Sequence, residues 1–423
     1  MEATQTICLL NDSFPPLVDG VANTVKNYAQ NLMNSPYDPL VITPACADAQ
    51  DECFPYPIVR YPSIPVQKFH GYPAGVPFSP EVIRNLSDRN VQVLHTHCPF
   101  MSTLMARQLR QVTDAPVILT YHTKFDVDIS SILKMRPLQV AAIKSMVENI
   151  SACDEIWTVS QGAGENLRSL GYEGDFTVMP NGVDLPRQRA TDAQIADATQ
   201  GYDLPRDVPL YLFVGRMMWY KGLRIILDAL ATLKARNRDF RMVFIGDGDN
   251  RAEVEDYALA CGLMDKCVFT GAIRDREVLR GWYSRADLFL FPSTYDTNGL
   301  VVREAAACDL ATVMIQGSCA AEDVTDGRNG FLIEETSEAL AACLLSLDQE
   351  KMRDIGLAAS RELYVSWEEA VNNAAQRYPI VIDRYKSGYY PPKKRPIEGL
   401  MKINGELMEA LSKLPQLRQK QEV

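Results

Sequence analysis

Short β-rich apolar segments alternate with helical segments along nearly the whole chain, and this alternation most constrains the fold. It predicts an α/β architecture in which helices cover parallel sheets. At 423 residues the chain is too long for one ordinary core and fits two such units. The strands predicted for the first unit are Ile7–Leu10, Leu40–Thr43, Val91–His95, Val117–Tyr121, Ile156–Ser160 and Phe176–Met179. Those predicted for the second unit are Pro209–Val214, Met242–Ile245, Cys267–Phe269, Leu288–Phe291, Thr312–Ile315 and Phe331–Ile333.

The segment Pro180-Asn181-Gly182-Val183-Asp184 has the composition of a turn and separates the two units. We expect a first Rossmann-like domain over residues 1–185 and a second over residues 186–366. A helix over 367–388 is expected to return to the first domain. A basic amphipathic tail follows over 389–423, and its apolar stripe suits packing on the body and binding at a membrane surface equally.

The composition excludes several kinds of protein. A net charge of −11 argues against nucleic acid as a partner. The ten cysteines form no C-x-x-C pair, which is typical of reduced thiols in the cytoplasm. The first residues predict a strand and not a signal peptide, and no apolar segment reaches the roughly 18 residues of a membrane span. We therefore expect a cytoplasmic protein.

Two loops that follow predicted strands carry groups suited to an anion. Gly20 follows the first strand and precedes a helix, whose N-terminus can offer N–H groups to a phosphate. Arg216 and Lys221 follow the first strand of the second unit, where they could bind a diphosphate as a fork and a point charge. Ligands of such sheets bind beyond the carboxyl ends of the strands, so the position favours a ligand over incidental charge.

The segment after the fourth strand of the second unit is the most informative. Asn298, Gly299 and Leu300 lead into a helix, and their backbone N–H groups are expected to bind phosphate. Asp296 precedes them and is expected to face a sugar. Glu304 lies one to two turns into an otherwise apolar helix, where it could accept hydrogen bonds from ribose hydroxyls. Helix capping is the alternative for one polar residue here, but it does not account for Glu304.

Histidines follow two strands of the first unit. One is His122, which stands between Tyr121 and Lys124, and the other is His97, which precedes Cys98. A lone histidine is more often structural than functional. A zinc site at His97 and Cys98 is disfavoured, because successive side chains on a strand point to opposite faces and no second cluster completes the ligand set. We expect no metal.

These loops, in this order, resemble glycosyltransferase family 4 of the GT-B fold, in which two facing Rossmann-like domains hold a nucleotide sugar between them. The resemblance spans nearly the whole chain. The family's signature is two acids separated by seven residues, here Asp296 and Glu304, although glutamate is commoner than Asp296 at the first position. Asp19-Gly20 likewise stands where many members have two glycines. The resemblance implies a retaining hexosyl transfer from a nucleotide sugar, with uridine as the usual base and with no metal or other cofactor.

The resemblance also gives each candidate residue a role, with the cations on the leaving diphosphate, Glu304 on the ribose and Asp296 on the transferred sugar. The catalytic candidates are His122, Asp296, Arg216 and Lys221. The donor-binding candidates are Gly20, Arg216, Lys221, Asn298, Gly299, Leu300 and Glu304. The acceptor-side candidates are His97, Tyr121 and Lys124.

The acceptor is indicated by three further segments. Pro15–Val21, His95–Phe100 and Tyr121–Phe125 look most similar to the branch that glycosylates membrane lipids, such as diacylglycerol glucosyltransferases and sulfoquinovosyltransferases. Residues 125–146 could then present apolar side chains to the inner face of the membrane, or they could form a helix pair that faces the core. Two alternatives stay open: a soluble sugar or small-metabolite acceptor, and a non-catalytic GT-B module that only binds a nucleotide.

Overall fold

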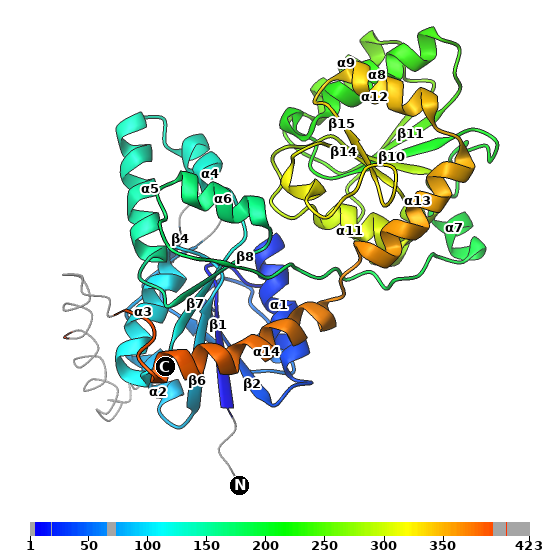
Figure 1. Cartoon of the computed structure of the whole chain (residues 1–423). Coiled ribbons are helices and arrows are strands. Elements are labelled where there is room, and N and C mark those ends of the chain that lie inside the picture. Colours follow the sequence, from blue (N-terminus) through cyan, green and yellow to red (C-terminus); the bar gives the residue numbers. More distant parts are fainter. Residues whose placement is uncertain (1–4, 18, 66–72, 392–402, 404–423) are drawn as a thin grey trace, which may run out of the picture. The chain divides into compact units, whose positions relative to one another are not determined.

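The computed structural model describes residues 5–17, 19–65, 73–391 and 403, which form two compact units (Figure 1). Unit 1 comprises the described residues of 1–159, 163–179 and 367–423. Unit 2 comprises residues 160–162 and 180–366. Within each unit a parallel sheet is covered by helices, as the alternation of segments predicted.

Unit 1 contains a seven-stranded parallel sheet in the order β3-β2-β1-β6-β7-β8-β9. Its strands are β1 (Gln5–Leu10), β2 (Tyr37–Pro44), β3 (Ile58–Tyr61), β6 (Asn90–Thr96), β7 (Val117–Tyr121), β8 (Glu155–Thr158) and β9 (Thr177–Val178). Beside this sheet, β4 (Ser63–Pro65) pairs antiparallel with β5 (Pro73–Gly75). The helices are α1 (Gly20–Leu32), η1 (Asp51–Cys53), α2 (Pro80–Leu86), α3 (Met101–Thr113), α4 (Phe125–Ile132), α5 (Arg136–Ile150), α6 (Gln161–Ser169) and α14 (Trp367–Lys386).

Helix α14 joins unit 1 although it lies far along the sequence from the other helices of that unit (Figure 1). The hydroxyl of Tyr378 hydrogen-bonds His95 Nδ1 at 2.9 Å, and its ring stacks on Trp157. Arg377 donates to both oxygens of the buried Glu155 carboxylate at 2.9 and 3.1 Å. Burial raises the pKa of Glu155, but hydrogen bonds led by the one from Arg377 outweigh this effect and lower it.

Unit 2 contains a six-stranded parallel sheet in the order β12-β11-β10-β13-β14-β15. Its strands are β10 (Leu210–Val214), β11 (Arg241–Ile245), β12 (Cys267–Gly271), β13 (Leu288–Phe291), β14 (Thr312–Ile315) and β15 (Phe331–Ile333). Its helices are α7 (Asp192–Ala198), η2 (Trp219–Lys221), α8 (Leu223–Ala235), α9 (Arg251–Ala260), α10 (Arg276–Arg285), α11 (Leu300–Ala307), η3 (Cys319–Ala321), α12 (Ser337–Ser346) and α13 (Gln349–Glu362). Every residue of β10, β13 and β14 is buried, as expected for strands covered on both faces.

The strand order reverses at the centre of each sheet. In unit 2 the chain runs outward from β10 through β11 to β12, and then crosses back to β13 on the other side of β10. In unit 1 the same reversal falls between β1 and β6. The loops that follow two such neighbouring strands diverge to opposite faces of the sheet and leave a crevice, which is where ligands of this fold bind.

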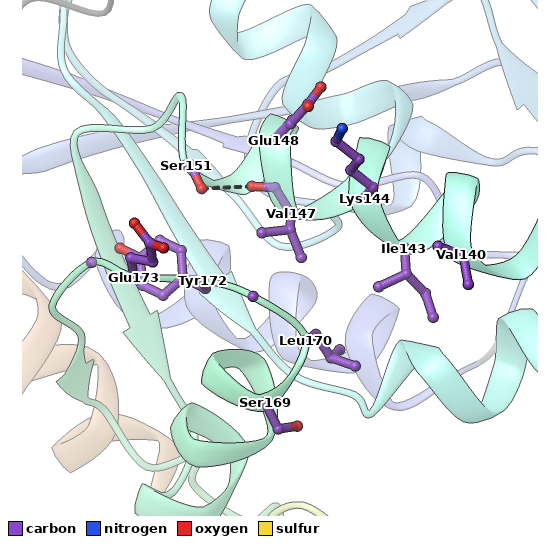
Figure 2. A pocket seen from close by; sticks show the side chains of 12 residues that line it. Val140, Ile143, Lys144, Val147, Glu148, Ser151, Ser169, Leu170, Tyr172 and Glu173 are labelled. Atoms are coloured by element: carbon purple, nitrogen blue, oxygen red, sulfur yellow. Dashed lines mark hydrogen bonds between the residues drawn. The ribbon is translucent and has the colours of Figure 1, made fainter.

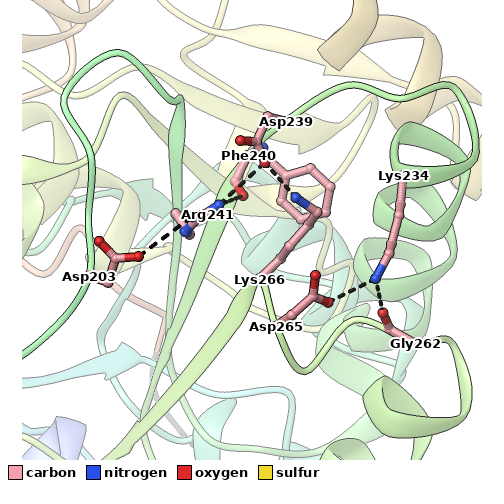
Figure 3. A network of polar contacts seen from close by, with 8 residues as sticks. All are labelled: Asp203, Lys234, Asp239, Phe240, Arg241, Gly262, Asp265 and Lys266. Atoms are coloured by element: carbon pink, nitrogen blue, oxygen red, sulfur yellow. Dashed lines mark hydrogen bonds and ion pairs between the residues drawn. The ribbon is translucent and has the colours of Figure 1, made fainter.

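A polar network lies at the amino ends of β11 and β12 in unit 2, at the other end of the strands from the crevice (Figure 3). Asp239 accepts hydrogen bonds from Arg241 and from Lys266, whose ammonium also lies 5.5 Å from the centre of the Phe240 ring. Lys234 forms an ion pair with Asp265 at 2.8 Å. Since the carboxylates are largely exposed, each pair contributes less than about 1 kcal/mol, and the network stabilises loops away from the crevice.

All twelve predicted strands occur, with ends that differ by at most a few residues. The sequence analysis missed β3, β4 and β5. These strands are short, and β4 and β5 each contain a proline, so the local pattern did not predict them. Most of the basic tail predicted over 389–423 lies outside the described residues. Over the parts of the chain that the structure describes, no helix is long and apolar enough to cross a membrane.

Candidate functional site

The loops after β10 and β13 meet at the crevice of unit 2 through one ion pair. Lys221 Nζ lies 2.5 Å from Asp296 Oδ1, and Ser293 Oγ donates to Asp296 Oδ2 at 2.6 Å. Gly222, the next residue, has φ of +77°, and a Cβ atom there would lie 2.1 Å from the carbonyl oxygen of Pro292. The backbones of the two loops therefore approach each other closely, and only glycine fits at that point.

Lys221 is buried, with its side chain 8% exposed. Burial lowers the pKa of Lys221, and the neighbouring charge of Arg216 adds to this effect, while Asp296 opposes it. The rings of Tyr220 and Tyr295 are in contact with each other, with centroids 4.6 Å apart, and both lie on the same side of the ammonium, at 5.7 and 5.3 Å from Nζ. This is a desolvated cation held by one carboxylate.

Arg216 differs from Lys221 in its surroundings. Its side chain is exposed and makes no hydrogen bond or ion pair with the described residues. It lies beside Gly215 in the same loop, and its charge influences the pKa of Lys221. The crevice of unit 2 thus carries one cation that is neutralised by Asp296 and one that is available to a ligand.

Helix α11 begins at this crevice with a glycine at its N-cap. Gly299 has φ of +61°, and a Cβ atom there would lie 2.7 Å from Cβ of Ala320. The cap therefore has no side chain to accept from the first N–H groups of α11, one of which belongs to Leu300. Asn298 Oδ1 accepts from Arg303 Nε at 3.1 Å, which holds the loop against the helix.

Glu304 is buried on α11, and both of its oxygens are engaged. Arg276 Nη2 donates to Oε1 at 2.6 Å, and the Tyr283 hydroxyl donates to Oε2 at 3.0 Å. Burial raises the pKa of Tyr283, and the adjacent Glu304 carboxylate adds to the rise, so this phenol stays a donor. A carboxylate has about four lone-pair directions, so Glu304 can still accept from ligand hydroxyls.

The histidines of unit 1 form a buried cluster. His97 Nδ1 lies 3.0 Å from His122 Nε2, and the rings of His95 and His97 lie 4.2 Å apart. Burial lowers the pKa of all three, to about 3 for His122. His122 is therefore a neutral imidazole whose ring is positioned by His97.

The other acceptor-side candidates have different surroundings. Tyr121 is fully buried in the core of unit 1, where its hydroxyl donates to Asn166 Oδ1 at 2.9 Å. Lys124 is partly exposed just before α4. Gly20, a donor-binding candidate, is the exposed first residue of α1. The next two N–H groups of α1 already donate to Asp19, which limits what this helix can offer an anion.

No group of three or more His, Cys, Asp or Glu side chains that could hold a metal ion occurs among the residues that the structure describes. His97 and His122 contact each other through ring nitrogens, and His95 hydrogen-bonds Thr120 and Tyr378. The residues that sequence reasoning missed are Ser293, Arg276 and Tyr283. Ser293 acts through Asp296 in its own loop. Arg276 and Tyr283 act through Glu304 from another part of the chain, and no local motif singles them out.

Two family models match the chain. The model described as Glycosyltransferase Family 4 matches residues 18–187, and the model described as Glycosyl transferases group 1 matches residues 195–361. Together they cover most of the sequence. The chain is a family 4 glycosyltransferase.

Curated relatives of this glycosyltransferase differ in what their names say they act on. A GDP-mannose-dependent alpha-mannosyltransferase of Corynebacterium glutamicum is 28% identical over 89% of each chain. An alpha-monoglucosyldiacylglycerol synthase of Acholeplasma laidlawii is 23% identical over 78% of this chain and 85% of its own, and a sulfoquinovosyl transferase of Arabidopsis thaliana is 24% identical over 92% and 74%. A D-inositol 3-phosphate glycosyltransferase of Xylanimonas cellulosilytica is 29% identical over 66% and 69%. The resemblance to the lipid branch is confirmed, and relatives named for a soluble acceptor are present as well.

A solved structure shows the same fold. The sucrose-phosphate synthase of Thermosynechococcus elongatus superposes with a TM-score of 0.71 at 22% identity, covering 90% of this glycosyltransferase and 99% of that chain. Two Rossmann-like units with these strand orders are the GT-B architecture predicted from the sequence.

Replacing Lys221 or Glu304 tests the site of unit 2. We expect Lys221→Ala and Glu304→Ala each to reduce sugar transfer by at least about 100-fold, because each removes a preorganised group that is expected to contact the donor. Transfer is measured with a labelled nucleotide sugar, and folding is followed by circular dichroism. Lys234→Ala removes a lysine of the polar network at the other end of the strands and serves as the matched control. Wild-type turnover in a folded Lys221→Ala or Glu304→Ala variant would remove the residue from the site.

The buried histidines make the stability of unit 1 sensitive to acid. Between pH 6.5 and about 3 the unfolded chain binds a proton at His122 that the folded chain does not, so stability falls as the pH falls through this window. Each such histidine contributes about 1 kcal/mol of loss between pH 7 and pH 5.5. Urea unfolding should therefore show a smaller loss in His122→Gln than in the wild type. Equal losses in the two proteins would mean that folding does not lower the pKa of His122.

Proposed function

We propose that the glycosyltransferase moves a hexose from a nucleotide diphosphate sugar to a hydroxyl of a membrane lipid, with retention and without a metal. The observation that carries the donor class is the pairing of a buried Lys221 with an exposed Arg216 at the open N-terminus of α11. Two cations and a helix N-terminus without a side-chain cap together suit a diphosphate. They do not suit a neutral ligand.

Stabilising the negative charge of the leaving diphosphate is the main catalytic requirement in this proposal. As the bond to the sugar breaks, negative charge builds up on the diphosphate, where Arg216 and Lys221 stabilise it in a partly desolvated site. These fixed cations supply the charge that a metal ion supplies elsewhere. Glu304 binds the ribose hydroxyls from the position that Arg276 and Tyr283 give it. Asp296 orients the sugar and keeps Lys221 in place.

The state of the two carboxylates favours retention without a covalent glycosyl intermediate over a double displacement. Both oxygens of Asp296 and both oxygens of Glu304 accept hydrogen bonds from the chain, so each carboxylate is held as an orienting group and not as a free nucleophile. The acceptor hydroxyl then attacks the face from which the diphosphate leaves and gives its proton to that diphosphate. His122, neutral at physiological pH, positions the sugar by hydrogen bonding.

The lipid acceptor is supported by a surface on helices α4 and α5, which we call the α5 surface. Ile132, Met135, Leu138 and Val140 expose 42, 62, 51 and 58% of their area within nine residues. Lys134, Arg136 and Lys144 accompany them in sequence. Exposed apolar side chains beside basic ones are the features of a helix that binds at an anionic membrane surface.

A pocket of about 690 Å³ continues the α5 surface toward the end of α6 (Figure 2). Val140, Ile143 and Val147 line it from α5, and Leu170 lines it from the segment after α6. We propose that the α5 surface and this pocket contact lipid, which would place the protein in the cytoplasm and peripherally on the inner membrane face.

UDP-glucose is the donor we propose, because one lipid-acting relative is named for glucosyl transfer to diacylglycerol and because uridine is the usual base in the family. A soluble acceptor is the second candidate, supported by the relative named for D-inositol 3-phosphate. A non-catalytic module is disfavoured, because the charged residues expected of a donor site are all present. The loops at the crevice of unit 2 carry Arg216, Lys221 and Asp296, and α11 carries Glu304.

The first test is transfer of label from UDP-glucose, and from a panel of other nucleotide sugars, into the organic phase of vesicles with and without diacylglycerol. We expect label in the lipid only when diacylglycerol is present. Release of nucleotide without a lipid product would keep the enzyme class and overturn the lipid acceptor. The anomeric configuration of the product decides whether transfer proceeds with retention, and activity in excess chelator decides metal independence.

Replacing two residues of the α5 surface tests the membrane contact. The double variant Met135→Ser/Leu138→Ser should bind vesicles at least about 10-fold more weakly, because two apolar side chains no longer enter the interface. Co-sedimentation with anionic vesicles measures this binding. Leu259→Ser/Met264→Ser removes two similarly exposed apolar residues of unit 2 and is the control. Equal binding by the two double variants would place the membrane contact elsewhere.

A further inference from the structure

The helices that follow the two central strands differ in their N-caps between the units. In unit 2, α8 follows β10 and α11 follows β13, and their N-cap residues are the glycines Gly222 and Gly299. In unit 1, α1 follows β1 and α3 follows β6. There the chain places a carboxylate on the N-terminus of each helix.

Asp19 is the carboxylate on α1. Its Oδ1 accepts from the N–H groups of Val21 and Ala22 at 2.8 and 2.7 Å, and its Oδ2 accepts from Ser13 Oγ at 2.6 Å. The positive end of this helix is therefore compensated by a negative charge of the chain itself. An anionic ligand at this N-terminus would have to compete with Asp19 for the N–H groups and approach its charge.

Asp12 does the same for α3 from a distant part of the sequence. Its two oxygens accept from the N–H groups of Met101 and Ser102 at 3.1 and 2.5 Å. Burial raises the pKa of Asp12, and the hydrogen bonds that it accepts oppose the rise. The second helix N-terminus at the reversal point of this sheet is thus also occupied.

The cations at the same edge of unit 1 are mostly engaged within the chain. Arg60, which lies on β3, forms an ion pair with Asp51 at 2.8 Å and donates to the carbonyl oxygens of Pro15 and Pro44. The histidines that end β6 and follow β7 are kept neutral by burial. Lys124, in the loop between β7 and α4, is a further cation at these strand ends among the described residues.

We propose that unit 1 accepts an uncharged alcohol, and that Asp19 is the residue that discriminates against acceptors carrying a phosphate near the reacting hydroxyl. This inference rests on the proposed function for the assignment of the acceptor to unit 1. It separates neutral acceptors, such as a diacylglycerol or a free polyol, from phospholipids and sugar phosphates. The discrimination is electrostatic. A phosphate at the N-terminus of α1 would meet the Asp19 carboxylate, whereas α8 and α11 have no carboxylate at their N-caps.

The test compares two acceptor pairs, and in each pair one member is neutral and the other carries a phosphate group. The lipid pair is dioctanoylglycerol and dioctanoylphosphatidylglycerol, and the soluble pair is myo-inositol and D-inositol 3-phosphate. For whichever pair accepts label, kcat/KM is measured for the wild type, Asp19→Asn and Asp348→Asn. Asparagine caps a helix as well as aspartate does but carries no charge. Asp348 caps α13 in unit 2 by accepting from Lys351 N–H at 2.8 Å, so its variant is the matched control.

We expect the wild type to favour the neutral member by at least about 10-fold, and Asp19→Asn to reduce this preference several-fold while Asp348→Asn leaves it unchanged. A wild type that uses both members of its pair equally well would overturn the proposal. So would the same preference in Asp19→Asn and Asp348→Asn. Transfer within the soluble pair alone would end the lipid proposal and still decide the role of Asp19, so the two failures are distinguishable.

Discussion

The reversal of strand order at the centre of each sheet is the constraint on which the site depends. Parallel strands all end at one edge, and at the reversal the two following loops leave toward opposite faces. In unit 2 this brings Lys221 to within 2.5 Å of Asp296, although 75 residues separate them in sequence. The ion pair holds a buried ammonium that would otherwise be costly, and a diphosphate entering the crevice would meet cations already in place.

Much of this arrangement follows from the sequence, because it is local. Runs such as Leu288–Phe291 are continuous and apolar, so they predict buried parallel strands, and polar residues directly after them predict an edge that binds a ligand. The acids Asp296 and Glu304 stood out for the same reason, being charged residues in short loops or apolar helices. The apolar pattern does not encode the order of the strands in the sheet. Parallel strands alone are enough to bring the loops to one edge.

What the sequence did not predict is the set of long-range partners. Arg276 and Tyr283 reach Glu304 from α10, Asp12 reaches α3 from the loop after β1, and Tyr378 reaches His95 from α14. Each contact depends on side-chain direction in the folded chain and leaves no periodic signal. The same limit explains His97, whose part in positioning His122 follows from a 3.0 Å contact between two strand ends.

The two units have the same fold but place groups of opposite charge beside the N-termini of the helices that follow their central strands. Unit 2 leaves its helix N-termini open beside Arg216 and Lys221, which suits a ligand with two phosphates, whereas unit 1 compensates its own helices with Asp19 and Asp12. A phospholipid bound to unit 1 would bring its phosphate against Asp19 without gaining free N–H groups. A diacylglycerol presents only a hydroxyl, and its acyl chains require no charge from the protein. The α5 surface and the carboxylates of Asp19 and Asp12 thus support the same proposed acceptor, a neutral lipid, for independent physical reasons.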